Sequence, residues 1–194
     1  MKRIALLTAV AVVAATATAM LGLAVRARAA MPAQDKYDLK VPGGLAFSEF
    51  RGYEDWQAVG VSHPQEAQTL NLIVANPAMV AAFRAGIPGS GTPFPDGSRM
   101  AKITYGSRQQ PGAPFSSKVP GELLGVGFMV KDSKRFSDSG GWGWAQFKYD
   151  AASEKFAPFT MTDTPPQAND ARCGFACHTA AKAKDYVFTE YSKR

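Results

Sequence analysis

The only two cysteines of the chain lie near its C-terminus, in the segment Cys173-Gly-Phe-Ala-Cys177-His178. A cysteine pair followed directly by a histidine is the pattern by which c-type haem is attached. The two thiols add to the vinyl groups of the haem, and the imidazole takes an axial position on the iron. The segment therefore predicts one covalently bound haem c, held by Cys173 and Cys177, with His178 as the axial iron ligand.

The spacing of the two cysteines departs from the usual pattern. In C-x-x-C-H two residues separate the cysteines, whereas three separate them here. If the segment starts a helix, the additional residue moves Cys173 by about 100° around the helix axis. Both thioether bonds can still form if the first turn is irregular, which Gly174 would permit. Otherwise Cys177 alone holds the haem.

Three other interpretations of the cysteine pair are open. A disulfide between Cys173 and Cys177 would suit an exported chain. A closed zinc site needs four ligands, and beyond the thiols the chain offers only His63 and His178 as soft ligands. A thioredoxin-like pair would have the spacing C-x-x-C beside a βαβ pattern, and the chain has neither. The absence of other cysteines favours haem attachment.

Residues 1–29 have the pattern of an export signal. Lys2 and Arg3 precede an uncharged run over residues 4–25, and Ala27-Arg28-Ala29 offers a cleavage site. Because c-type haem is attached outside the cytoplasm, this pattern agrees with the cysteine segment, and it predicts a periplasmic protein. If the run is not cleaved, its length approaches the roughly 20 residues that span a bilayer, and it would anchor the chain.

Removal of residues 1–29 also changes the charge balance. The chain has 22 basic and 16 acidic residues, and four of the basic ones lie in this segment, which leaves 18 against 16, a formal charge of +2. No basic stripe remains that would suggest binding to nucleic acid. Residues 30–194 have the length of one ordinary domain, and we expect a single haem domain there.

The pattern of apolar residues predicts an α+β fold with an antiparallel sheet core, flanking helices and a C-terminal helix that bears the haem. Asn76-Pro77 opens one helix, because Asn is a good N-cap and Pro suits the first helical position, and Gly86 closes it. Several short strands with turn signals between them favour an antiparallel sheet. We expect strands over 57–61, 69–74, 99–105, 122–131, 140–149 and 155–161, a helical turn over 53–56, a polar loop over 106–121, and helix over 173–178 and 180–191.

The position of the haem segment separates classes of haem protein. Small electron carriers have their attachment segment near the N-terminus, and a methionine ligand follows it. Here residues 179–194 follow His178 and contain no methionine. A strand-rich middle does not fit a four-helix bundle. We therefore expect an open distal iron site. An electron carrier would need a sixth ligand from upstream, for which the candidates are Met79, Met100, Met129, Met161 and His63.

Five segments, in this order along the chain, resemble the cytochrome P-460 family of β-rich mono-haem periplasmic proteins. The similarity covers essentially all of residues 30–194, and the order and spacing of the segments make it specific. The segments are Tyr53-Glu-Asp-Trp56 with Val59-Gly60, Phe94-Pro-Asp-Gly-Ser-Arg-Met-Ala-Lys102, Val130-Lys-Asp-Ser-Lys-Arg-Phe136, Gly140-Gly-Trp142, and Cys177-His178 with Val187-Phe-Thr189.

The resemblance implies a role for Lys102 that the residues alone would not suggest. In this family a strand lysine shortly after an Asp-Gly turn bonds covalently to a meso carbon of the haem, and Lys102 occupies that place. Without the resemblance, Lys102 is one lysine on an alternating strand, and exposure to solvent would be its ordinary state. A third covalent tether would distort the macrocycle, which is one way in which a protein tunes its iron.

The resemblance also implies a distal carboxylate, and here this chain differs. Hydroxylamine oxidisers of the family place a carboxylate on the strand before Val130-Lys131-Asp132 as a proton acceptor. By spacing, that position is Gly127. Glu122 lies on the same strand, but roughly 16 Å along it. A positioned base contributes roughly 10²–10⁴-fold to a proton transfer, so its loss would slow turnover more than binding.

Together these features predict a haem-dependent oxidoreductase that oxidises hydroxylamine towards nitrous oxide and passes electrons to a small periplasmic carrier. The main alternative is a non-catalytic protein that binds nitric oxide or carbon monoxide, like the cytochrome c′-beta relatives of the family. Those relatives lack the lysine bond. Gly127 favours this alternative and Lys102 favours the enzyme; a plain electron carrier is the third interpretation. Homodimerisation is an expectation from the family.

Overall fold

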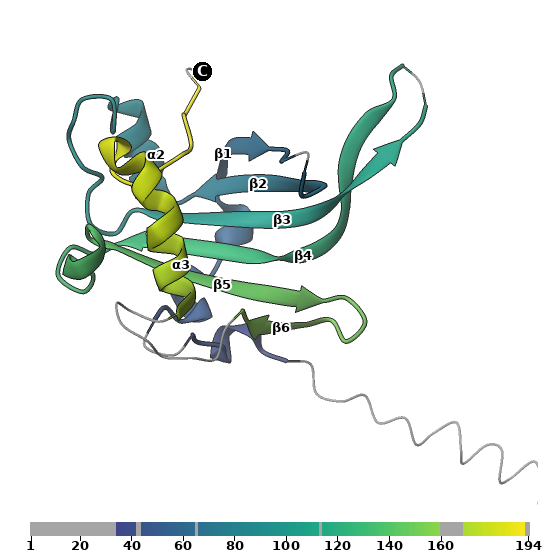
Figure 1. Ribbon diagram of the computed structural model, residues 1–194, viewed down its shortest axis with the longest axis horizontal. Helices are drawn as coiled ribbons and strands as arrows, with labels where there is room; N and C mark the ends of the chain where they lie inside the picture. The colour runs from purple at the N-terminus through teal and green to yellow at the C-terminus, as the bar shows by residue number, and fades with distance from the viewer. Residues whose placement is uncertain (1–33, 42–43, 65, 113, 160–168, 193–194) are drawn as a thin grey trace, which may run out of the picture. The chain divides into compact units, whose positions relative to one another are not determined.

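The computed structural model describes residues 34–41, 44–64, 66–112, 114–159 and 169–192 (Figure 1). The predicted export signal over residues 1–29 lies outside this range. In the described part of the chain, no helix has the length and apolar character needed to cross a membrane. The residues from Asp35 onward form one compact unit.

Six antiparallel strands form one sheet, and they follow one another in the sheet in the order of the chain (Figure 1). With the helices that flank it, this sheet confirms the predicted α+β class, and the C-terminal helix is also present. The strands are β1 (Gln57–Ser62), β2 (Thr69–Ala75), β3 (Arg99–Gln110), β4 (Ser117–Lys131), β5 (Trp142–Asp150) and β6 (Lys155–Pro158).

The helices lie on both faces of the sheet. The helix predicted from Asn76-Pro77 is confirmed as α2, because the Asn76 side chain accepts a hydrogen bond from the Met79 N–H at 3.1 Å. Helix α3 contains the cysteine segment and crosses one face of the sheet (Figure 1). The helices are α2 (Pro77–Arg84) and α3 (Asn169–His178), with 3-10 helices η1 (Lys36–Asp38), η2 (Phe47–Phe50), η3 (Tyr53–Asp55), η4 (Ser137–Ser139) and η5 (Thr179–Lys184).

Alternation along the strands divides the apolar residues into two cores, one on each face of the sheet. The first core packs the N-terminal 3-10 helices against the sheet and is rich in aromatic rings, with Phe50 stacked on Phe128 at 4.1 Å. The second core lies under α2, α3 and the C-terminal residues, and it includes Met100, Met129 and Trp144. The functional side chains lie on this second face.

Three segments differ from the sequence-based expectation. The predicted loop over 106–121 is largely strand, since β3 and β4 continue as a two-stranded ribbon with Gln110 opposite Ser117. The ribbon extends past the last residue pair of β2 with β3, so most of its side chains face water and lack apolar alternation. The predicted helix over 180–191 ends at Lys184, because Asp185 and Tyr186 both adopt left-handed backbone angles. The last strand ends at Pro158, and residues 160–161 lie outside the described range.

Candidate functional site

Helix α3 lies close against strand β5, and a glycine makes this approach possible. A Cβ atom added at Gly174 would lie 2.6 Å from Cγ of Trp144, which is closer than side chains can pack. The sequence suggested that Gly174 permits an irregular first turn. The structure gives it a different function, because α3 is continuous through the segment and Gly174 is the contact point between helix and sheet.

We expect Gly174→Ala to destabilise the haem-loaded protein by about 1–3 kcal/mol, the usual cost of overpacking a filled contact. At an exposed helical position the same change would stabilise by up to about 1 kcal/mol, so the sign is informative. Urea unfolding measures it, with Ala176→Gly at an exposed position of α3 as the matched control, expected to cost about 0.5–1 kcal/mol. A stabilised Gly174→Ala protein would show that α3 does not press on Trp144.

The two cysteines lie on the same side of α3. Residues four apart in a helix are neighbours on its surface, and Cys173 and Cys177 both line the same cavity. Both cysteines are exposed, and no disulfide joins them. The additional residue between them is therefore accommodated within a regular helix, which keeps both thiols directed to one side.

The imidazole of His178 is oriented by a backbone carbonyl. Its Nδ1 donates to the carbonyl oxygen of Tyr186 at 2.6 Å, since a carbonyl can only accept. This contact fixes the tautomer and leaves Nε2 as the nitrogen that can bind a metal. The sequence indicated that such a partner should exist but not which group supplies it.

The surroundings of His178 favour its neutral form. Burial lowers the pKa of His178, the positive charge of Lys102 lowers it further, and the hydrogen bond to Tyr186 opposes this shift. The ring of Trp144 lies 5.6 Å from the imidazole on one side, and the ring of Phe188 lies 5.0 Å away. Neutral imidazole is the form that ligates iron, so the environment suits a metal ligand.

Lys102 lies on the floor of the same cavity, which the sheet forms opposite α3. In the sheet it is paired with Ile73 on one side and Gly127 on the other, and Gly127 is paired in turn with Gln146. All four residues line the cavity, so this cross-strand row forms its floor. A Cβ atom on Gly127 would meet only Cε of Lys102, at an ordinary 3.7 Å. The floor therefore has space at position 127, where the resemblance implies a carboxylate.

The cavity measures about 770 Å³, a size that accommodates a large cofactor. Its rim carries apolar side chains that are unusually open to solvent, with Val61 71%, Phe188 55% and Phe159 47% exposed. A planar apolar macrocycle in the cavity would cover such side chains. Two thiols and one neutral imidazole on one helix, facing a space of this size, fit a haem.

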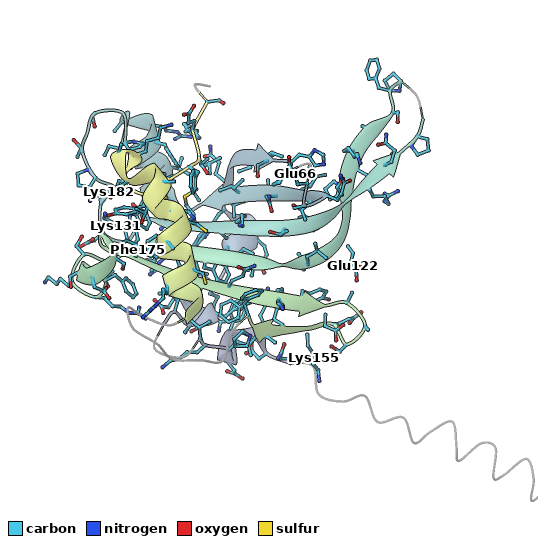
Figure 2. All side chains as sticks on the ribbon, in the orientation of Figure 1. Glu66, Glu122, Lys131, Lys155, Phe175 and Lys182 are labelled. Atoms are coloured by element: carbon cyan, nitrogen blue, oxygen red, sulfur yellow. The ribbon has the colours of Figure 1, made fainter. Side chains whose placement is uncertain are left out.

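The remaining candidates from the sequence do not all reach the cavity. Glu122 does not line it and lies toward the outer end of β4, away from α3 (Figure 2). His63 is also outside it, with its Nε2 3.3 Å from Oγ of Ser107. Met100 and Met129 contribute to the cavity wall but are packed into the second core, only 4% and 6% exposed. Met79 is buried in the same core, and Met161 lies outside the described residues.

Segments that are distant in the sequence meet around the cavity. A Cβ on Gly60 of β1 would lie 3.0 Å from the side chain of Thr189, so the C-terminal residues run along β1. The side chain of Gln57 donates to the hydroxyl of Tyr191 at 2.9 Å. The C-terminal residues after η5 therefore close one side of the cavity, and α3 closes another.

The fold and the site define a β-rich haem protein whose cofactor cavity lies between a C-terminal helix and an antiparallel sheet. The family model described as Cytochrome P460 matches residues 50–189. This match covers well over half of the chain, so the chain belongs to the cytochrome P460 family and binds haem. The resemblance inferred from the sequence is confirmed. No curated protein matches the chain.

Proposed function

We propose that the chain carries one haem c, bound through Cys173 and Cys177 and ligated by His178, and that it oxidises hydroxylamine towards nitrous oxide in the periplasm. The observation that carries the proposal is the convergence of both thiols, this imidazole and Lys102 on one cavity. A haem bound there supplies an iron that takes up small nitrogen compounds and accepts electrons from them. The cysteine segment and the export pattern support covalent attachment and the periplasmic location.

The reaction makes two demands on the protein. Conversion of two hydroxylamine molecules to nitrous oxide and one water releases four electrons and four protons. The electrons require an acceptor, for which we propose a small periplasmic electron carrier. The protons require a base, and the described residues that line the cavity supply few groups that could accept a proton. Glu190 is the carboxylate among them, but it is 79% exposed and pairs with Lys184.

In this proposal the residues that bind the haem have separate tasks. Cys173 and Cys177 hold the macrocycle on α3, and His178 presents Nε2 to the iron. Lys102 would bond to the macrocycle from the sheet and so tune the chemistry of the iron. The floor at Gly127 leaves space for a small substrate. Met100 and Met129 line the cavity from the second core, and we propose that neither ligates the iron.

The alternative is a protein of the cytochrome c′-beta type that binds nitric oxide or carbon monoxide without turnover. Gly127 favours it, because the floor of the cavity has no proton acceptor there. Lys102 favours the enzyme. The deciding experiment adds hydroxylamine to the haem-loaded protein with an oxidised electron carrier and follows carrier reduction and nitrous oxide. Binding of nitric oxide without carrier reduction would establish the alternative.

We expect Lys102→Ala to abolish a lysine–haem bond that is present in the wild-type protein. The wild-type mass should fall short of chain plus haem by the hydrogens lost at that bond, and the Soret band of the ferrous form should be red-shifted. The variant should show simple addition and an ordinary c-type spectrum. Intact-protein mass spectrometry and absorption spectra measure both, and alkylation of free thiols counts the cysteines that are not attached.

Lys118→Ala is the matched control for this change, because Lys118 is an exposed lysine on β4 outside the cavity. Its mass should differ from the wild type only by the substitution. Identical spectra in the wild type and Lys102→Ala would exclude the cross-link.

A further inference from the structure

A largely buried ion pair lies outside the haem cavity. Nζ of Lys131, at the end of β4, contacts both carboxylate oxygens of Asp185 at 2.8 and 3.0 Å. Their side chains are only 5% and 12% exposed. Neither residue of the pair lines the haem cavity, so the cofactor site described above does not account for it.

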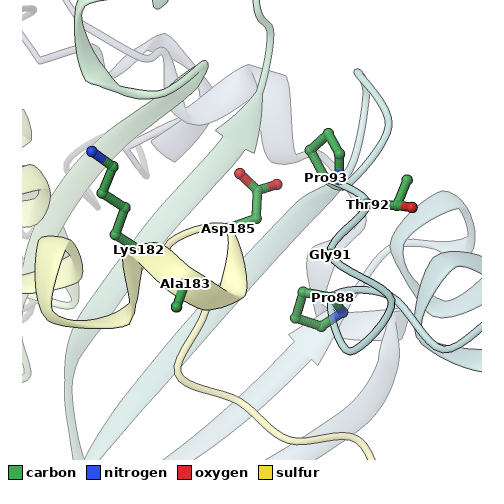
Figure 3. A pocket seen from close by; sticks show the side chains of 7 residues that line it. All are labelled: Pro88, Gly91, Thr92, Pro93, Lys182, Ala183 and Asp185. Carbon is green, nitrogen blue, oxygen red and sulfur yellow. The ribbon is translucent and has the colours of Figure 1, made fainter.

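The pair ties four separate segments of backbone together. Lys131 also donates to the carbonyl oxygen of Gly140 at 3.0 Å. The Asp185 carboxylate accepts a hydrogen bond from the Phe94 N–H at 2.8 Å. Figure 3 shows Asp185 on the turn after η5, facing the loop that contains Pro93 across a small cavity of about 140 Å³. The ion pair therefore joins this turn to β4, to the loop before β5 and to the loop before β3.

The turn held in this way is backbone of an unfavourable kind. Asp185 and Tyr186 have φ angles of +49° and +64°, which residues other than glycine rarely adopt in succession. The Tyr186 ring packs so closely on Gly140 that a Cβ atom there would lie 2.3 Å from it. This conformation directs the Tyr186 carbonyl oxygen to Nδ1 of His178 at 2.6 Å. A continuous series of contacts thus runs from the ion pair, through the left-handed turn and the Tyr186 carbonyl, to His178.

We propose that Lys131 and Asp185 are positioning residues for the axial imidazole. They hold the left-handed turn so that the Tyr186 carbonyl fixes the ring orientation of His178 and raises its basicity. The inference rests on the proposed role of His178 as iron ligand. A buried ion pair adds little net stability compared with apolar packing, and specifying one geometry is a recognised use. Partners behind a metal-bound histidine typically matter about 10–100-fold for affinity or activity.

The test uses the haem-loaded protein with Lys131→Met, Asp185→Ala and Asp185→Asn. Two quantities report on the ligand bond: the iron–histidine stretching band in the resonance Raman spectrum of the ferrous form, and the reduction potential. We expect Lys131→Met and Asp185→Ala to lower the band frequency and raise the potential, because a less basic imidazole stabilises ferric iron less. Asp185→Asn should shift both less, since asparagine tolerates the left-handed conformation and still accepts from Phe94.

Two controls separate positioning from general effects. Lys134→Met removes an exposed lysine near Lys131 and should leave band and potential unchanged. Phe50→Leu lowers stability on the opposite face of the sheet and should also leave both unchanged. A shift in Phe50→Leu equal to that in Lys131→Met would overturn the proposal, because destabilisation alone would then explain it. A shift in Asp185→Asn as large as in Asp185→Ala would overturn the geometric explanation and the proposal with it.

One further variant separates this proposal from the function on which it rests. If the band persists in His178→Ala, His178 is not the ligand and the proposed site fails. If His178→Ala loses the band while Lys131→Met and Asp185→Ala keep the wild-type band and potential, the positioning role alone is wrong.

Discussion

Replacing His178 with alanine is expected to remove the axial ligand and to abolish hydroxylamine oxidation. The loss should exceed the roughly 10–100-fold that follows from damage to an outer partner of a ligand. The physical reason is that Nδ1 is engaged by the Tyr186 carbonyl, so Nε2 is the atom free to bind iron. Because the proposed thioether bonds would hold the haem on α3, the variant should retain haem and lose its histidine-ligated spectrum. Absorption spectra, haem content per chain and turnover measure these effects.

Exogenous imidazole provides the decisive control for this variant. Truncation at His178 leaves a space between Trp144 and Phe188, whose rings flank the side chain, and imidazole should enter it and restore part of the spectrum. His63→Ala is the matched histidine control, since His63 lies outside the cavity. It should behave as the wild type. Full activity in His178→Ala, or equal loss in His63→Ala, would contradict the assignment of the ligand.

The sequence predicts the sheet well where side chains alternate against a buried core. The predicted bounds of β2 and of the start of β3 agree with the structure within one residue, because alternate side chains of these strands pack into the apolar cores on the two faces of the sheet. For the distal parts of β3 and β4 the sequence predicts a loop, because a two-stranded ribbon in water requires no alternation of apolar residues. Its existence depends on pairing between residues such as Gln110 and Ser117, which no local pattern records.

The candidate site is predictable to a similar extent. Local sequence patterns indicate its chemical groups, but they do not indicate the contacts that hold these groups in place. The cysteine segment indicates haem by itself, and the family resemblance indicates Lys102. In contrast, the orientation of His178 depends on the left-handed backbone of Asp185 and Tyr186. Aspartate and tyrosine do not predict a left-handed backbone. The contacts of Asp185 with Lys131 and Phe94 stabilise this conformation. The sequence identifies Gly174 as a flexible position, but only the structure shows that it faces Trp144.

The cross-strand row that forms the cavity floor contains both residues that distinguish the two competing functions. Lys102 and Gly127 are direct neighbours in adjacent strands, so the residue that favours the enzyme stands beside the residue that favours a binding protein. A side chain at position 127 would project into the same space as the end of Lys102. A substitution at position 127 can therefore test whether the cavity lacks a proton acceptor, and it leaves His178 unchanged.

Introducing a carboxylate with Gly127→Glu is expected to raise the rate of hydroxylamine oxidation by roughly 10²–10⁴-fold, the usual contribution of a positioned base. The site can accept the side chain, because a Cβ atom at Gly127 meets only Cε of Lys102 at 3.7 Å and its backbone does not require glycine. The new carboxylate would lie in the cavity, where protons released from bound substrate need an acceptor. Steady-state reduction of an electron carrier measures the gain.

Gly127→Gln is the matched control, since glutamine has nearly the same shape and cannot accept a proton at neutral pH. If the base is what the cavity lacks, the glutamate variant gains activity and the glutamine variant does not. The ferrous spectrum should match the wild type in both, which would show that the haem environment is intact. Equal rates in the two variants would mean that proton transfer does not limit turnover. Absence of turnover in both, with nitric oxide still bound, would identify the chain as a gas-binding member of its family.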